Sequence, residues 1–155
     1  MNRATKKMEP AIGRQTQHIR GVASLTMEAR DGVLFAQVKG LVTVAEEPEI
    51  CRRLALERGD LDAVCIDYSR TVLAITERGL DELCRKAVPD QAIAWVVPDE
   101  TAVMWRGQAN KFGMFGLSRF ATHLPAEARE WAIDQAKCQA LWRAWCAQHH
   151  PGGAA

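Results

Sequence analysis

Two short, largely apolar runs constrain the fold of this chain more than any other feature. The first is Leu61–Tyr68, broken late by Asp67, and the second is Ala92–Val97. Runs of this length that are apolar at nearly every position predict strands buried on both faces, as parallel strands usually are. The segment between them is long enough for a helix, so the two runs predict a βαβ unit with a parallel sheet. Each run is also far too short to cross a membrane.

A tight turn earlier in the chain predicts an antiparallel arm. Asp31-Gly32 separates the alternating segments Leu25–Arg30 and Val33–Lys39. Asp-Gly is a strong hairpin signal because both residues tolerate the positive φ angles that a two-residue hairpin turn requires. We expect Gly40 to end the second strand of this arm.

Helix caps and apolar spacing predict four helices, over residues 44–58, 76–87, 101–111 and 125–148, with a short strand over 118–123. The expected order is β-β-α-β-α-β-α-β-α, a single α/β domain with a mixed sheet whose parallel strands lie at its centre. We assign residues 1–22 to a flexible N-terminal tail, 23–148 to the domain and 149–155 to a flexible C-terminal tail.

Composition narrows the classes of partner. The chain has 155 residues, of which 48% are apolar, enough to bury the core of one domain. Its formal net charge is only +1, so no overall field favours nucleic acid or an anionic membrane. The five cysteines are widely spaced and form no CxxC pair, which is typical of a reducing compartment and of buried thiols. We expect a cytoplasmic protein with no membrane span.

Two stretches are similar to parts of one known family. Ala63–Leu80, with the sequence AVCIDYSRTVLAITERGL, resembles the central strand, the following loop and the start of the second helix of the STAS domain. That domain occurs in bacterial anti-sigma-factor antagonists and at the cytoplasmic ends of sulphate transporters. Phe115–Leu124, followed by Pro125–Ala132, is similar to its Gly-Leu, short last strand and Ala-rich final helix. The resemblance implies a STAS-like mixed sheet and a non-catalytic regulatory or protein-binding module.

The chain departs from that family at its regulatory position. The family carries an Asp-Ser-Ser-Gly-Leu type string, whose serine a partner kinase phosphorylates. Thr76, Glu77 and Arg78 stand here in place of Asp, Ser and Ser, so the usual phospho-acceptor is absent. Glu77 at a helix N-terminus is either a permanent stand-in for phosphate or an ordinary first-turn acid, and we favour the second interpretation.

No motif for catalysis is present, because the chain has neither a glycine-rich phosphate loop nor a GxSxG elbow. Asp67 lies near the carboxyl end of a buried strand, where open α/β sheets bind ligands. It either binds a ligand or caps the following loop, and capping is the favoured interpretation. Ser69 is interpreted as a turn residue rather than a nucleophile, although Ser69 and Thr76 are the hydroxyls nearest the family's phosphorylation position. We expect no catalytic residue and no cofactor.

Two further groups of residues are compatible with a metal site or a nucleic-acid site but do not favour one. Cys146, His149 and His150 would share a helix face if the last helix continued, but a frayed end before Pro151 is favoured over a metal site. The basic and aromatic stretch from Trp105 to Gly113 is interpreted as a solvated helix face with core anchors. We therefore expect no metal and no nucleic-acid partner.

The last predicted helix carries apolar residues on two faces. One stripe holds Trp131, Cys138, Leu141, Trp142 and Trp145, and the second holds Ile133, Ala136 and Ala140. The domain's own sheet covers one face, and the other is a homodimer seam, a partner groove or merely alanines at the surface. We predict a contact with a protein partner or a second copy, anchored by Trp142 and Trp145 with Leu141 beside them. The alternative function is a small apolar-ligand or lipid binding protein, with its pocket between the sheet and the Trp-bearing helices.

Overall fold

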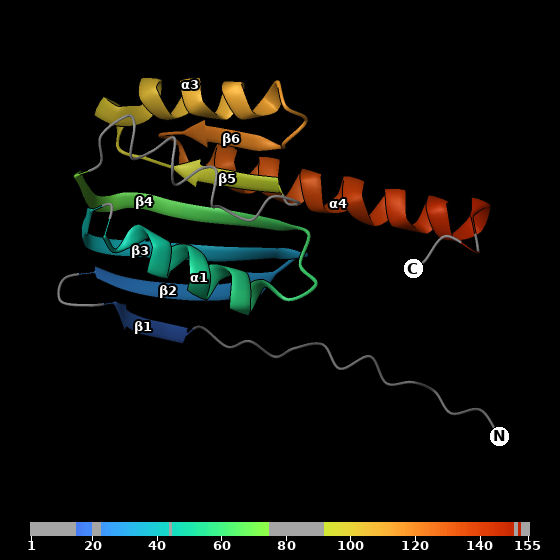
Figure 1. Ribbon diagram of the computed structural model, residues 1–155, viewed down its shortest axis with the longest axis horizontal. Helices are drawn as coiled ribbons and strands as arrows, with labels where there is room; N and C mark the ends of the chain where they lie inside the picture. The colour runs from blue at the N-terminus through green and yellow to red at the C-terminus, as the bar shows by residue number, and fades with distance from the viewer. Residues whose placement is uncertain (1–14, 20–22, 44, 75–91, 151, 153–155) are drawn as a thin grey trace.

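The computed structural model describes residues 15–19, 23–43, 45–74, 92–150 and 152 of the chain. One mixed sheet runs through the described residues, and its six strands lie side by side in chain order (Figure 1). They are β1 (Gln15–Ile19), β2 (Ala23–Arg30), β3 (Val33–Thr43), β4 (Ala63–Ala74), β5 (Ala92–Val96) and β6 (Arg119–Thr122). The pairs β1–β2 and β2–β3 are antiparallel, and β3 to β6 are parallel. The α/β class, the mixed sheet and the antiparallel arm are thus confirmed.

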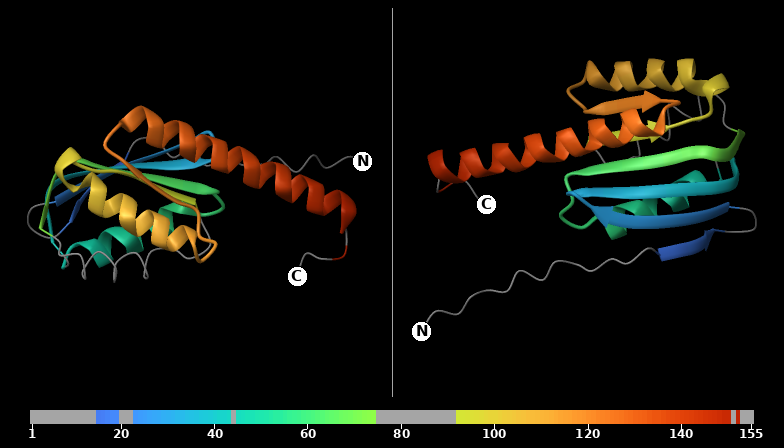
Figure 2. Two further views of the ribbon diagram at one scale, coloured as in Figure 1. Left: turned by 90° about the horizontal axis from the view of Figure 1, so that it is seen from above. Right: turned by 180° about the vertical axis from the view of Figure 1, so that it is seen from behind.

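Helices cover both faces of this sheet. α1 (Glu47–Arg58) and α3 (Ala102–Gly113), the latter preceded by the short helix η1 (Asp99–Thr101), lie on one side. α4 (Pro125–His149) lies on the other side, as Figure 2 shows. The helix expected over 76–87 lies outside the described residues. From β2 onward the described strands and α-helices otherwise follow the predicted order. None of the described helices is both long and apolar enough to cross a membrane.

The two faces of the sheet are packed differently. On the α1 and α3 side, large side chains such as Leu25, Ile66 and Trp95 pack against Ile50 and Trp105 in the larger core. On the α4 side the contact is made mostly of small side chains, namely Ala63, Ala92 and Ala94 of the strands and Ala128, Ala132 and Ala136 of the helix. Both β4 and β5 contribute to both cores, which explains why their sequences are apolar without alternation.

The hairpin turn forms as its sequence predicts. Asp31 has φ 53° and Gly32 has φ 76°, the left-handed conformation that this turn requires. A Cβ at Gly32 would lie 3.3 Å from the Cβ of Ala136, so the turn also touches α4. The arm is therefore held to the helix as well as to its neighbouring strand.

Two strand ends were predicted wrongly. Gly40 does not end β3, which continues to Thr43 with Gly40 paired to Ala23 on one side and Thr71 on the other. β4 likewise continues past Tyr68 to Ala74. The two strands extend together as a parallel pair, and the ladder hydrogen bonds that each supplies to the other outweigh the local turn preference of glycine and serine.

The assignment of residues 1–22 to a flexible tail is also wrong in part. Gln15–Ile19 form β1, which pairs with the edge of β2. The sequence of β1, QTQHI, has little apolar character, so it gives no periodic signal, whereas strand pairing satisfies the backbone groups of β2 whatever the side chains. At the other end α4 extends through His149, one residue into the segment assigned to the C-terminal tail.

Candidate functional site

The second half of α4 extends beyond the sheet and exposes large apolar side chains. Ala136 is the last buried residue of the helix, and the turns from there to His149 span about 20 Å. Figure 1 shows this end of α4 projecting past the strands. Leu141 is 71% exposed, Trp142 60% and Trp145 45%. Apolar side chains of this size seldom gather on a surface that has no contact to make.

These side chains form one continuous surface, which we call the α4 stripe and define as Cys138, Leu141, Trp142 and Trp145. They line a shallow groove together with Ala144 and Gln148. The rings of Trp142 and Trp145 stack with centroids 5.3 Å apart and planes 15° apart. His149 also stacks on Trp145, with ring centroids 4.4 Å apart. The three predicted interface residues Leu141, Trp142 and Trp145 therefore lie together on one exposed face.

An ion pair ties this projecting end to the sheet. The Arg143 guanidinium donates to both carboxylate oxygens of Asp62, with Nη2 2.8 Å from Oδ2. Asp62 directly precedes β4, so the bidentate contact sets the direction in which the end of α4 points. It also balances the charge of Arg143 within the chain itself.

Asp67 and Ser69 lie together at an irregularity in β4. The register shifts between Gln37 and Lys39 of β3, where β4 carries one extra residue, which makes a β-bulge. The Asp67 carboxylate Oδ1 accepts a hydrogen bond from the backbone N–H of Ser69 at 2.8 Å. Asp67 therefore caps a bulge rather than a loop. Ser69 is an exposed strand residue, so its interpretation as a turn residue is wrong.

The remaining predicted binding residues, Thr76, Glu77 and Arg78, lie outside the described residues. The interpretation of Glu77 as an ordinary first-turn acid stays a prediction, as does the absence of phosphorylation at this position.

A buried acid that the sequence did not single out lies at the start of α1. Glu47 is 3% exposed, and its Oε1 accepts a hydrogen bond from the Tyr68 hydroxyl at 2.6 Å. Its Oε2 is buried without a hydrogen-bond partner. Burial raises the pKa of Glu47 to about 7, and the hydrogen bonds from Tyr68 and Cys51 oppose that rise. The sequence signal for this acid was the chain's single tyrosine, because a hydroxyl in a buried central strand needs a polar partner.

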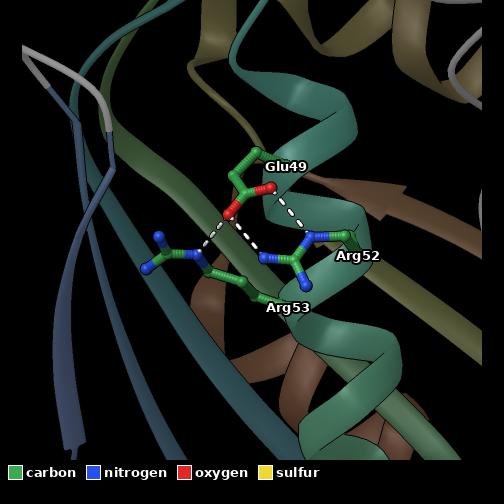
Figure 3. Close-up of polar contacts among 3 residues, drawn as sticks. All are labelled: Glu49, Arg52 and Arg53. Atoms are coloured by element: carbon green, nitrogen blue, oxygen red, sulfur yellow. Dashed lines mark hydrogen bonds and ion pairs between the residues drawn. The ribbon is translucent and has the colours of Figure 1, made fainter.

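A neighbouring acid on α1 behaves in the opposite way. Glu49 accepts hydrogen bonds from Arg52 Nε and Arg53 Nε, each at 2.9 Å (Figure 3). The hydrogen bonds from Arg52 and then Arg53 lower the pKa of Glu49 to about 2. This cluster is on the surface of the helix, where such ion pairs support helix formation. These ion pairs join residues of one helix to each other and do not line a binding cavity.

The described side chains do not assemble a hydrolase-like site around Ser69. His123 Nδ1 lies 3.2 Å from Arg106 Nη2 and 3.6 Å from Asp99 Oδ1, whereas Ser69 interacts through its backbone with Asp67. Within the described ranges no group of three or more His, Cys, Asp or Glu residues is arranged to hold a metal ion.

The end of α4 and the thiols both differ from expectation. The helix does not fray before His149; instead His149 stacks on Trp145, and its Nδ1 lies 2.8 Å from the Trp145 carbonyl oxygen.

The described cysteines are free thiols, and Cys65 is buried as predicted. Cys138, however, is exposed, because it belongs to the α4 stripe beyond the sheet.

Comparison with known proteins gives distant likenesses of structure. No family model matches the sequence, and no curated protein matches it. The chain is similar to an uncharacterized protein from the DUF3478 family with a SpoIIAA-like fold, from Shewanella loihica PV-4, with 12% identity and a TM-score of 0.48 over 77% of this chain and 99% of that chain. It is also similar to an antisigma-factor antagonist STAS domain from Rhodobacter sphaeroides, with 17% identity and a TM-score of 0.36 over 72% of this chain and 92% of that chain. We assign the fold of this chain from its strand order and register.

Proposed function

We propose that this chain is a non-catalytic regulatory, protein-binding module and that its α4 stripe binds a second copy of the same chain. The observation that carries the proposal is the exposed, stacked pair Trp142 and Trp145 on a part of α4 that the sheet does not cover. Large aromatic side chains at the centre of an apolar surface supply most of the binding energy of many protein interfaces.

The spacing of the stripe suits pairing with itself. Cys138, Leu141, Trp142 and Trp145 recur at the three- and four-residue intervals that put side chains on one helix face. If two copies of α4 cross antiparallel about a two-fold axis, Leu141 of one copy lies opposite Trp142 of the other, and Cys138 lies opposite Trp145. A two-fold interface needs such a self-complementary surface.

The charges around the stripe also favour an apolar, symmetric contact. Residues 135–150 contain no Asp or Glu, and their full cations are Lys137 and Arg143. Arg143 is already paired with Asp62. An anionic membrane surface is bound by clusters of several cations, which this helix end lacks. With a net charge of +1, two copies repel each other little.

The area of the stripe predicts a reversible dimer. A tryptophan side chain buries roughly 150–250 Å² when fully covered. The partly exposed Leu141, Trp142 and Trp145 therefore offer about 300–400 Å² per copy, less than the roughly 800 Å² per partner of a standard interface. We expect a dissociation constant on the order of micromolar or weaker.

The alternative of an apolar-ligand pocket is less well supported. Trp105 is buried between α3 and the sheet, with its ring centroid 5.3 Å from Trp95 and 5.7 Å from Tyr68. Among the described residues these rings fill the space that the alternative assigns to a ligand.

Free thiols support a reducing compartment, so we propose the cytoplasm as the location of the module.

Sedimentation velocity of the full chain, in reducing buffer from micromolar to millimolar concentration, tests the proposal. We expect the average mass to rise from one copy towards two. The double variant Trp142→Ala/Trp145→Ala should stay at one copy throughout this range, because it removes both aromatic anchors.

Phe115→Ala is the matched control, since Phe115 is an exposed aromatic residue outside α4. It should dimerise like the parent. Far-UV circular dichroism establishes that each variant is folded. A parent that stays at one copy, or a folded double variant that dimerises as tightly as the parent, contradicts the proposal.

A further inference from the structure

A charged groove lies on the α4 side of the sheet, beside the helix. α4 packs chiefly on β4, β5 and β6, so the same face of β2 and β3 is left open. Strand register places two rows of side chains on this face: Glu28, Phe35 and Cys65 in one, and Thr26, Gln37, Asp67 and Val96 in the next. Arg129 of α4 and Arg30 of β2 complete the lining of a groove of about 280 Å³. That volume suits a small metabolite.

The groove is lined by equal numbers of positive and negative side chains, and these side chains do not form ion pairs with one another. Glu28 and Asp67 supply two carboxylates, and Arg30 and Arg129 supply two guanidiniums. Within the part of the chain that the structure describes, neither the Arg129 side chain nor the Glu28 side chain forms a hydrogen bond or ion pair. Asp67 uses one oxygen to accept from Ser69. Arg30 lies over the Phe35 ring at 5.0 Å and is paired with Asp31, with its Nε 3.8 Å from Oδ2. An unpaired cation and a partly free anion therefore line one cavity.

The floor between these charges is uncharged, with Thr26 and Gln37 beside Phe35, Cys65 and Val96. Burial raises the pKa of the Cys65 thiol to about 12, the negative charge of Asp67 adds to that rise, and Arg129 opposes it. Asp67 and Arg129 line the same groove as this thiol. Phe35 and Val96 line the same floor.

We propose that this groove binds an α-amino acid with an apolar side chain. Its carboxylate pairs with Arg129, its ammonium group pairs with the free oxygen of Asp67, and its side chain packs on Phe35. A zwitterion matches a site with zero net charge and separated opposite charges, whereas a phosphate would be repelled by two carboxylates and a metal cation by two guanidiniums. The site is separate from the α4 stripe and goes beyond the dimer proposed above.

Isothermal titration calorimetry of the full chain with leucine, methionine and phenylalanine tests this assignment. We expect saturable binding of at least one of them. Its N-acetyl derivative and its amide derivative, which each lack one charge, should bind roughly ten- to a hundredfold more weakly, because each loses a charge-assisted hydrogen bond.

Variants of the chain provide the second arm. Arg129→Gln and Asp67→Asn should each weaken binding by a similar factor, and Asp67→Asn keeps an oxygen that can accept from Ser69. Lys137→Gln, which removes an exposed cation of α4 outside the groove, should bind like the parent, as should Trp142→Ala. The proposal is overturned if none of the three amino acids binds, if the derivatives bind as tightly as the parent amino acid, or if folded Arg129→Gln and Asp67→Asn bind it unchanged.

Discussion

At the scale of single residues, the most unusual environment is that of Glu47. Its carboxyl group is buried at the first turn of α1, where it accepts from Tyr68 and leaves Oε2 without a hydrogen bond. A charged carboxylate is costly in such a place, since burial removes its hydration. Protonation relieves that cost, which is why the pKa lies near 7 instead of 4.5.

This environment predicts a pH-dependent stability. Between about pH 4.5 and pH 7 the folded chain holds the Glu47 proton and the unfolded chain has lost it, so the free energy of unfolding falls as pH rises through this window, by about 3 kcal/mol in total. Glu47→Gln keeps a carbonyl oxygen for Tyr68 and should flatten the slope. Urea unfolding at several pH values measures how the free energy of unfolding changes with pH. Glu57→Gln on the same helix is the control, and an equal slope in parent and Glu47→Gln would contradict the assignment.

At the scale of elements, the sequence predicted those structures whose cause is local. The turn Asp31-Gly32 and the buried runs of β4 and β5 carry their own signals, in φ preference and in continuous apolar character. β1 and the extensions of β3 and β4 depend instead on pairing with a neighbouring strand, which no local pattern records. The same holds for the sites. The α4 stripe was predicted because it lies on one helix. Of the groove only Asp67 was a predicted binding residue, because strand register brings the other residues to it.

The alanine face of α4 leads to a prediction for this element. Ala132 is fully buried against the sheet, so Ala132→Leu has no room for its side chain and should lower the free energy of unfolding by about 1–3 kcal/mol. Ala140→Leu, on the same helix but exposed, should change it by less than about 0.5 kcal/mol. Chemical denaturation of both variants makes the comparison. Similar losses in both would mean that α4 does not pack on the sheet through this face.

At the scale of the whole molecule, dimerisation through the α4 stripe couples to folding. Because the unfolded chain cannot form the paired helices, mass action stabilises the folded dimer increasingly as concentration rises. We expect the Tm of the parent to increase by a few degrees between micromolar and millimolar chain. The Tm of Trp142→Ala/Trp145→Ala should not depend on concentration. Differential scanning calorimetry at matched concentrations measures both, and a parent Tm independent of concentration would argue against a dimer.

The strand order of the sheet bears on how the chain reaches its fold. Each strand from β2 to β6 is hydrogen-bonded to the strand that precedes it in the chain, so no strand must be inserted later between two others. Pairing between strands that follow one another in the chain closes shorter loops than pairing between distant strands, which lowers the entropy cost of forming the sheet. During synthesis the sheet is therefore able to grow strand by strand from the hairpin arm, and α4 then covers an alanine surface that is already assembled.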